Sequence, residues 1–258
     1  MKTAFITLSQ EGAALIPRLQ HEFGEIDCFV HESVATTAEC GRFARIVELT
    51  GELFSQYREL IYAAPCGVVV RSLANCVDNK LNDPAVVVMD VRARWTVSLL
   101  SGHEGGANNL TIRVANVFDA EPVITTTTEA VKDLIVGIGC RRGAGCGQIV
   151  EAIQSALGLT RMPLDRVRLL ASAEVKHDEQ GLLRAAEQLK IPIRFLSMAQ
   201  IASCQQAVSQ SEFVRKSVGV PAVAEPAALL AGRRTTLLLQ KTVFNQVTVA
   251  IAQESFTL

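Results

Sequence analysis

The polar residues most able to do chemistry in this chain follow an apolar run that ends at Leu100. Residues 101–109 read Ser-Gly-His-Glu-Gly-Gly-Ala-Asn-Asn, and a helical pattern begins after them. Glycines let a backbone approach a ligand closely, and a histidine imidazole is mostly neutral and able to accept a proton at pH 7. We therefore interpret His103 as a general base, the alternative being a histidine that caps the helix. Glu104 either orients that imidazole or only favours the helix dipole.

A second glycine-rich break, at residues 137–145, also lies between an apolar run and a helical pattern. It reads Gly-Ile-Gly-Cys-Arg-Arg-Gly-Ala-Gly. We expect free amides at this turn, because a helix N-terminus follows it. Ligands also collect at the carboxyl ends of strands in open α/β sheets. Arg141 and Arg142 would add guanidinium groups suited to carboxylates or phosphates. The turn lacks the Lys-Ser/Thr and glycine spacing of nucleotide-binding motifs, and the alternative is an ordinary turn with solvated arginines.

Other polar groups are weaker candidates. In the first half, Arg71, Ser72, Lys80 and Asp83 bracket a helical segment and the turn after it, as a binding surface or as solvated surface. In the second half, Glu225 stands among small apolar residues at the start of a helix, either as a site acid or as a helix N-terminal charge. No serine stands in a nucleophile-elbow sequence, so the sequence offers no grounds for a serine hydrolase triad.

The composition indicates a globular protein that stays in the cytoplasm. Of 258 residues, 49% are hydrophobic and 20% charged, and the net charge of −1 argues against nucleic-acid binding. The seven cysteines include no Cys-x-x-Cys pair, so we expect reduced, mostly buried thiols and no protein-held metal. No apolar run reaches the roughly 18 residues needed to span a bilayer, and we expect no membrane association.

Strand and helix patterns alternate along the chain, and the alternation restarts after residue 133. This order predicts an α/β fold: two three-layer α/β/α domains with mainly parallel sheets, at residues 1–128 and 133–258. The second domain should end in an antiparallel hairpin that turns at Phe244-Asn245. The predicted strands are 3–8, 26–31, 60–64, 85–90, 95–100, 122–126, 134–138, 168–171, 193–196, 235–239 and 247–252. The predicted helices include 10–23, 45–57, 66–77, 147–157, 181–189 and 226–231.

An ordered set of motifs runs through both halves. They are Val70-Arg71-Ser72-Leu73, Lys80 with Asp83-Pro84-Ala85-Val86, Leu99 to His103 with Gly105 to Asn108, Pro122 to Thr126, Gly137 to Gly143, Ser211 to Val214, Gly219 to Glu225, and Val247 to Ala250. Together they resemble the CbiG proteins of anaerobic cobalamin biosynthesis, the cobalt-precorrin-5A hydrolases, over nearly the whole chain.

Three features depart from that family. Members often carry a middle region where this chain has only residues 127–133, so it resembles a compact two-domain form. The second turn continues with Ala144 in place of the usual Thr or Ser, and Glu104 stands where an apolar residue is expected. These departures give us less reason to assign a role to Glu104 than to His103.

The resemblance implies opening of the ring-A δ-lactone of cobalt-precorrin-5A and release of acetaldehyde, which yields cobalt-precorrin-5B. It implies His103 or Glu225 as the catalytic group, cobalt carried by the substrate, and no cofactor held by the protein. The substrate carries many carboxylates, which suit arginines and helix amides. The implied substrate-binding residues are Arg71, Ser72, Lys80, Asp83, Ser101, Gly102, Gly105, Gly106, Asn108, Gly137, Gly139, Cys140, Arg141, Arg142 and Gly143.

Two other functions remain open. A non-catalytic corrinoid carrier or chaperone of the same pathway would use the same arginines and glycines without His103 or Glu225. An unrelated hydrolase or ligase would use the second turn for a nucleotide or another acidic metabolite, although the missing phosphate-binding lysine argues against it. Other enzymes of cobalamin synthesis and a second copy of the chain, forming a homodimer, are the macromolecular partners we consider.

Overall fold

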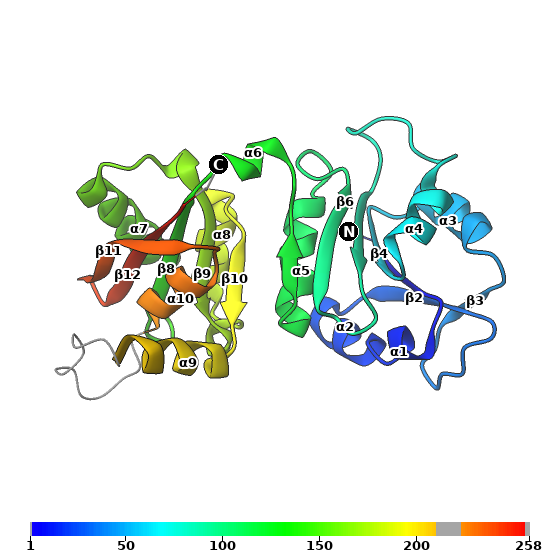
Figure 1. Ribbon diagram of the computed structural model, residues 1–258, viewed down its shortest axis with the longest axis horizontal. Helices are drawn as coiled ribbons and strands as arrows, with labels where there is room; N and C mark the ends of the chain where they lie inside the picture. Colours follow the sequence, from blue (N-terminus) through cyan, green and yellow to red (C-terminus); the bar gives the residue numbers. More distant parts are fainter. Residues whose placement is uncertain (1, 210–222, 256–258) are drawn as a thin grey trace. The chain divides into compact units, whose positions relative to one another are not determined.

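The computed structural model describes residues 2–209 and 223–255, and the chain divides into two compact units, Met1–Thr128 and Glu129–Leu258 (Figure 1). The short helix α6 (Thr127–Ala130) spans the boundary between them. The motif at 211–214 and residues 219–222 of the next motif lie outside the described residues. Within the described residues, no helix combines the length and apolarity needed to cross a membrane.

Unit 1 is built on a seven-stranded sheet with the order β3-β2-β1-β4-β5-β6-β7. All neighbours are parallel except β5 and β6, which form a hairpin. The Asp90 carboxylate holds this hairpin turn by accepting the amides of Arg92 and Arg94. Because β7 is parallel to β6, these two strands run opposite to the other five. The strands are β1 (Thr3–Thr7), β2 (Ile26–His31), β3 (Gly41–Phe43), β4 (Glu59–Ala63), β5 (Ala85–Met89), β6 (Trp95–Leu100) and β7 (Glu121–Val123).

Helices cover both faces of this sheet, because its central strands are apolar on both sides. Phe5, Ile61 and Val87 pack against α1, α2 and α5, whereas Ile6 and Tyr62 pack against α3 and α4. The helix predicted at 10–23 is in fact two helices, since α2 begins anew with a proline in its first turn. The helices are α1 (Gln10–Ala13), α2 (Ile16–Phe23), α3 (Ile46–Phe54), α4 (Cys66–Leu73) and α5 (Ala107–Phe118).

Unit 2 is built on a five-stranded sheet with the order β10-β9-β8-β12-β11. The strands β8, β9 and β10 are parallel, whereas β12 is antiparallel to both β8 and β11. The β11–β12 hairpin turns through Asn245 and Gln246, both with positive φ, as two-residue hairpin turns require. The strands are β8 (Leu134–Cys140), β9 (Val167–Ala173), β10 (Ile193–Leu196), β11 (Thr235–Phe244) and β12 (Val247–Glu254).

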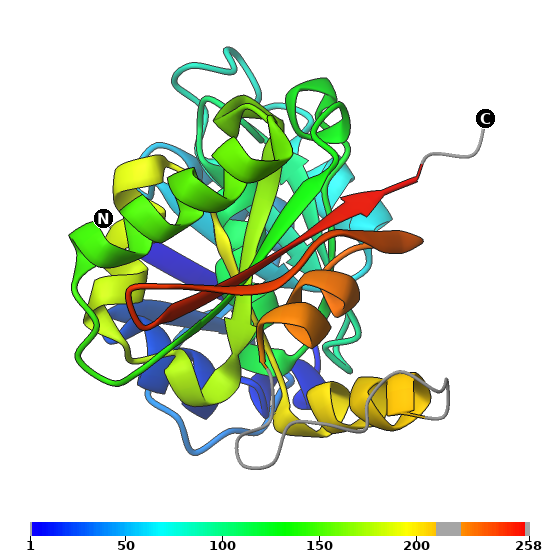
Figure 2. The ribbon, with the colours of Figure 1, turned by 90° about the vertical axis from the view of Figure 1, so that its left-hand side faces the viewer.

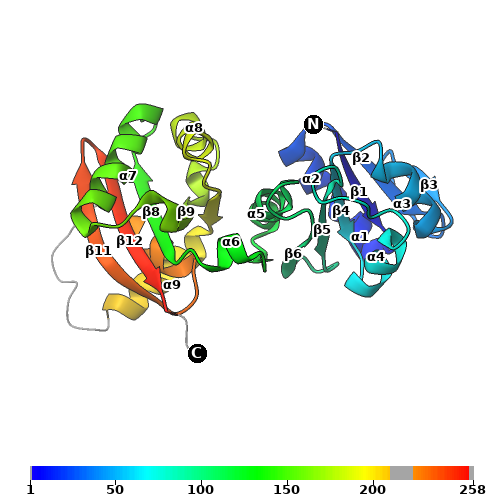
Figure 3. The same ribbon diagram turned by 90° about the horizontal axis from the view of Figure 1, so that it is seen from above.

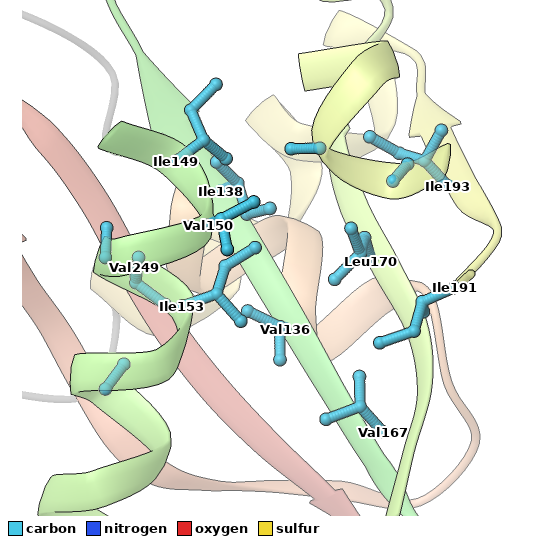
Figure 4. Close-up of a cluster of buried hydrophobic side chains, with 14 of the residues drawn as sticks. Val136, Ile138, Ile149, Val150, Ile153, Val167, Leu170, Ile191, Ile193 and Val249 are labelled. Atoms are coloured by element: carbon cyan, nitrogen blue, oxygen red, sulfur yellow. The ribbon is translucent and has the colours of Figure 1, made fainter. Parts of the chain in front are cut away.

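Two pairs of helices enclose the second sheet (Figures 2 and 3). The pair α7 (Cys146–Thr160) and α8 (Gln180–Leu189) covers one face, and α9 (Met198–Ser209) and α10 (Ala224–Leu230) lie on the other. Figure 4 shows the core under α7, where Ile149 and Ile153 meet Val136 and Ile138. Small residues, among them Ala224 and Ala228, let α10 approach its face closely. The predicted α/β/α layers and the terminal hairpin are therefore confirmed.

Candidate functional site

The glycine-rich loop of unit 1, residues 101–106, lies where β6 ends and β5 begins. The reversed direction of β6 causes this, because its last residue, Leu100, pairs with Val86 near the start of β5. A Cβ atom at Gly105 would lie 2.3 Å from Ser101 Cβ and 3.3 Å from the Asp83 carbonyl oxygen. The loop therefore packs against the segment that leads from α4 into β5, which carries Lys80 and Asp83.

The loop folds back over the start of α5 and supplies its own caps. The carbonyl oxygens of Ser101 and Gly102 accept the amides of Ala107 and Asn108 at 3.1 and 2.9 Å. Ser101 and Gly106 adopt left-handed conformations, with φ of 56° and 90°. Glycine accommodates this conformation without the steric cost that serine carries. The two capped amides at the start of α5 are engaged by the loop, so neither is free for a ligand.

A short polar network fixes the loop to the segment after β7. Ser98 Oγ donates to Asn108 Oδ1 at 2.8 Å, and Asn108 Nδ2 donates to Thr126 Oγ1 at 2.9 Å. A Cβ atom at Gly102 would lie 2.6 Å from Thr126 Cγ2, so glycine is needed there for packing. Asn108 is buried and supports the loop in this position. Sequence reasoning did not assign Ser98 or Thr126 to the site, because nothing in their spacing indicates this contact.

Ser101 has the most unusual environment in this loop. Its side chain is buried, and among the described residues its hydroxyl is the buried side-chain polar group without a hydrogen-bond partner. A buried unpaired polar group costs about 1–3 kcal/mol. Ser101 is therefore the loop residue that has most to gain from a ligand group able to reach it.

The titratable residues of the loop are exposed. Glu104 Oε1 lies 2.8 Å from Lys80 Nζ, and this hydrogen bond with the ammonium group lowers the pKa of Glu104. Lys80 was predicted to bind substrate and is here paired with a carboxylate of its own unit. His103 directly precedes Glu104 in this loop and is also exposed.

The remaining predicted residues of unit 1 differ in how available they are. Ser72 is buried and donates its hydroxyl to the Val69 carbonyl oxygen at 2.8 Å, so it acts in α4 packing and offers no surface to a ligand. Asp83 is also buried, and its carboxylate accepts the Asp78 amide. Arg71 is exposed, and its Nη1 donates a hydrogen bond to the Gly67 carbonyl oxygen, one turn back along α4, at 3.3 Å.

In unit 2, the turn at residues 141–145 follows β8, and the loop at 174–179 follows its parallel neighbour β9. The two loops meet, as the carboxyl ends of adjacent parallel strands do. Arg142 Nη1 lies 3.0 Å from Asp178 Oδ2, and the Gly143 amide donates to Glu179 Oε1 at 2.9 Å. The Gly143 amide and the Arg142 guanidinium therefore both have partners within unit 2, whereas α7 begins only at Cys146, after the turn. Sequence reasoning missed the loop, although its place after a predicted strand was a usable signal.

The other predicted residues of this glycine-rich segment lie at the end of β8 or next to it, and they differ in how closely they are packed. A Cβ atom at Gly137 would lie 1.9 Å from the Ala224 carbonyl oxygen, so this glycine admits the backbone of α10. Gly139 has looser surroundings. Burial raises the pKa of the Cys140 thiol, although nearby Lys176 opposes the shift. Arg141 Nη1 reaches Gln246 Oε1 at 3.4 Å.

Glu225, the second candidate catalytic group, lies in the first turn of α10. Its Oε1 accepts the backbone amide of Lys241 in β11 at 2.8 Å. The carboxylate is half-buried and tied to the sheet edge by this bond. The two candidate catalytic groups belong to different units, His103 to unit 1 and Glu225 to unit 2.

Comparison with protein families identifies both units. The family description "Cobalamin synthesis G N-terminal" matches residues 48–129, and "Cobalamin synthesis G C-terminus" matches residues 134–252. The chain belongs to the CbiG family. Only residues 130–133 separate the two matches in this CbiG protein.

Curated relatives extend the comparison. The chain is 25% identical to the cobalt-precorrin-5A hydrolase of Salmonella typhimurium, over 88% of this chain and 91% of that protein. It is 26% identical to the protein of the same name from Priestia megaterium, over 79% and 80%. The alignment with the Salmonella protein runs over 319 positions, more than the 258 residues of this chain. That relative therefore contains residues with no counterpart here, in agreement with a compact form.

Solved structures from the same group also match. Half of the chain, 48%, matches 99% of the cobalamin biosynthesis protein ChiG from Agrobacterium tumefaciens at 33% identity and a TM-score of 0.41. A cobalamin biosynthesis protein G homologue from Sulfolobus solfataricus matches over 98% of this chain at 16% identity and a TM-score of 0.38.

Proposed function

We propose that this CbiG protein is a cobalt-precorrin-5A hydrolase that opens the ring-A δ-lactone and releases acetaldehyde, giving cobalt-precorrin-5B. The observation that carries this proposal is the alignment with hydrolases of that name over most of both chains. The two family matches, one in each unit, support it further.

The reaction needs a group that moves protons at two steps. Water adds to the lactone carbonyl, and the bond from that carbon to the ring oxygen breaks, leaving a carboxylate and an alcohol. Loss of the alcohol proton then forms the aldehyde as the carbon–carbon bond to the macrocycle breaks. The electron pair stays on the conjugated macrocycle, which takes up a proton, so one water is consumed and one acetaldehyde leaves.

His103 suits the first step best among the described residues of unit 1. It stands on an exposed loop, and a positioned general base contributes roughly 10²- to 10⁴-fold to a rate. Glu225 is the second candidate, although its carboxylate already accepts the Lys241 amide. The macrocycle carboxylates suit Arg71, Lys80, Arg141 and Arg142, and cobalt enters as part of the substrate.

The test is an anaerobic incubation of the purified protein with cobalt-precorrin-5A, with acetaldehyde and the mass of the macrocycle measured in parallel. We expect acetaldehyde together with a product that has gained one water and lost one acetaldehyde. His103→Ala should lose at least about 10²-fold in kcat with unchanged binding, and His21→Ala, at an exposed histidine of α2, is the matched control and should keep the wild-type kcat. Binding without acetaldehyde release would instead indicate a corrinoid carrier. The absence of both binding and turnover would refute the proposal.

A further inference from the structure

We infer that Glu179 is a positioning residue that holds the 141–145 turn in the conformation in which Arg142 meets a substrate carboxylate. The effect on substrate rests on the proposed function, whereas the effect on the turn does not. Glu179 belongs to none of the motifs that pointed to the site. The contacts that assign this role lie between the loop after β9 and the turn after β8.

Glu179 is a buried carboxylate with two partners. Only 6% of the residue is exposed, its Oε1 accepts the Gly143 amide at 2.9 Å, and its Oε2 lies 3.7 Å from Lys176 Nζ. A buried carboxylate is costly unless it is paired and hydrogen-bonded, and its bond to an amide is strong because the acceptor is charged. Gly143 has a φ of 79°, so Glu179 holds a residue whose backbone has unusual freedom.

The same segment braces the turn a second time. A Cβ atom at Gly181 would lie 1.9 Å from the Ala144 carbonyl oxygen and 3.1 Å from the Ala144 carbonyl carbon. The start of α8 therefore packs directly on the backbone of the turn. The Glu179 carbonyl oxygen also accepts the amides of Leu182 and Leu183 in the first turn of α8. One residue thus begins α8 with its backbone and fixes the turn with its side chain.

This bracing bears on Arg142, the residue directly before Gly143. The Arg142 side chain is 72% exposed, and its guanidinium is paired with Asp178, which precedes Glu179. Without the Glu179 carboxylate, the Gly143 amide loses its partner and the turn can take other glycine conformations. Arg142 would keep its charge, but its backbone would no longer be held in one position. Substrate binding should therefore weaken while proton transfer by His103, a residue of unit 1, continues.

Three variants test this inference. Glu179→Ala removes the acceptor, whereas Glu179→Gln keeps an oxygen that can accept the Gly143 amide. Glu254→Ala is the matched control, because Glu254 is another buried carboxylate of unit 2 that is bonded to one cation, Arg168, and one amide, that of Arg233. It lies at the opposite end of the sheet, since its neighbour Gln253 pairs with Leu134 at the start of β8.

The measurements are hydrogen exchange of the Gly143 amide, and KM and kcat with cobalt-precorrin-5A, on the full chain. Glu179→Ala should speed that exchange and raise KM about tenfold with kcat unchanged, because a misplaced Arg142 loses a charge-assisted hydrogen bond to the substrate, and tenfold corresponds to about 1.4 kcal/mol. Glu179→Gln should restore both values. Glu254→Ala should lower the unfolding midpoint without changing either.

Two results would overturn the inference: a Gly143 amide that stays protected in Glu179→Ala, or a KM that rises equally in Glu254→Ala. A wild-type protein that neither binds nor converts the substrate would refute the proposed function. The exchange of the Gly143 amide would still decide whether Glu179 holds the turn.

Discussion

Gly137→Ala offers a quantitative test of how α10 packs on the second sheet. The new Cβ atom would lie 1.9 Å from the Ala224 carbonyl oxygen and 2.8 Å from the Ala228 amide nitrogen, whereas ordinary contact begins at 3.4 Å. Helix and strand would therefore have to separate by about 1.5 Å, the difference between these contact distances. Neither contact involves a flexible side chain, so the strain falls on the backbone of a buried interface.

The expected cost follows from two opposing effects. Overpacking of a core costs roughly 1–3 kcal/mol, and a backbone contact this close belongs at the upper limit. Replacing glycine by alanine in a strand returns up to about 1 kcal/mol. We therefore expect a loss of about 2 kcal/mol in the free energy of unfolding of unit 2, or a fall of roughly 8 °C in its midpoint at about 4 °C per kcal/mol.

Calorimetry that resolves the unfolding of unit 2 is the assay. The matched control is Gly158→Ala in α7, where a new Cβ atom would meet nothing within 4 Å. Gly158 is exposed, so this change should stabilise the unit by up to about 1 kcal/mol. A Gly137→Ala midpoint equal to or above that of the wild type would refute the close approach of α10 to β8.

Three further predictions concern single side chains. Ser101→Ala should stabilise unit 1 by about 1 kcal/mol in urea titrations, because it removes a buried unpaired hydroxyl, and a loss of stability would contradict this. The same variant should bind cobalt-precorrin-5A more weakly if that hydroxyl meets the substrate. Burial opposes ionisation of Asp133, but hydrogen bonds from Arg166 and Gln253 outweigh it and lower its pKa. Asp133→Asn should therefore destabilise unit 2 at pH 7, and the difference from wild type should shrink as the pH falls below the ordinary carboxyl pKa of 3.8. A stability difference between the variant and the wild type that is the same at pH 7 and below pH 3.8 would contradict that linkage. Gly181→Ala should destabilise unit 2 and raise the KM for cobalt-precorrin-5A, as judged against Gly147→Ala, where a Cβ atom has open space.

Much of the fold could be predicted because its strands are apolar on both faces. The runs at β1, β4, β5 and β8 stand out in the sequence for that reason, and alternating helices imply parallel pairing. The strand β3 escaped prediction, because three residues reading Gly-Arg-Phe show no periodicity. The break between α1 and α2 was also missed. Pro17 has no backbone N–H to continue a helix from α1, and the prediction did not take this into account.

The site was harder to predict than the fold. Sequence patterns located both glycine-rich turns, because each follows a strand, but they could not supply the partners of the residues found there. Arg142 pairs with Asp178, which lies 36 residues away, and Gly137 contacts Ala224, which lies on another element. Such contacts depend on which loops the sheet order brings together. For the same reason, Ser72 had the right residue type but a buried position.

The ion pairs at the two turns bear on what kind of ligand can bind there. Lys80 pairs with Glu104, and Arg142 with Asp178, and the four side chains are between 37% and 72% exposed. Exposed pairs contribute little to stability, so a ligand carboxylate that replaces Glu104 or Asp178 exchanges one weak pair for another. A ligand with one carboxylate gains almost nothing from this exchange. At the turn of unit 2, a rigid ligand with several carboxylates would engage Arg141 as a second group at a high effective concentration once Arg142 is bound. The pairing of these cations therefore favours ligands with several carboxylates over small acids, and it predicts binding that weakens as salt rises.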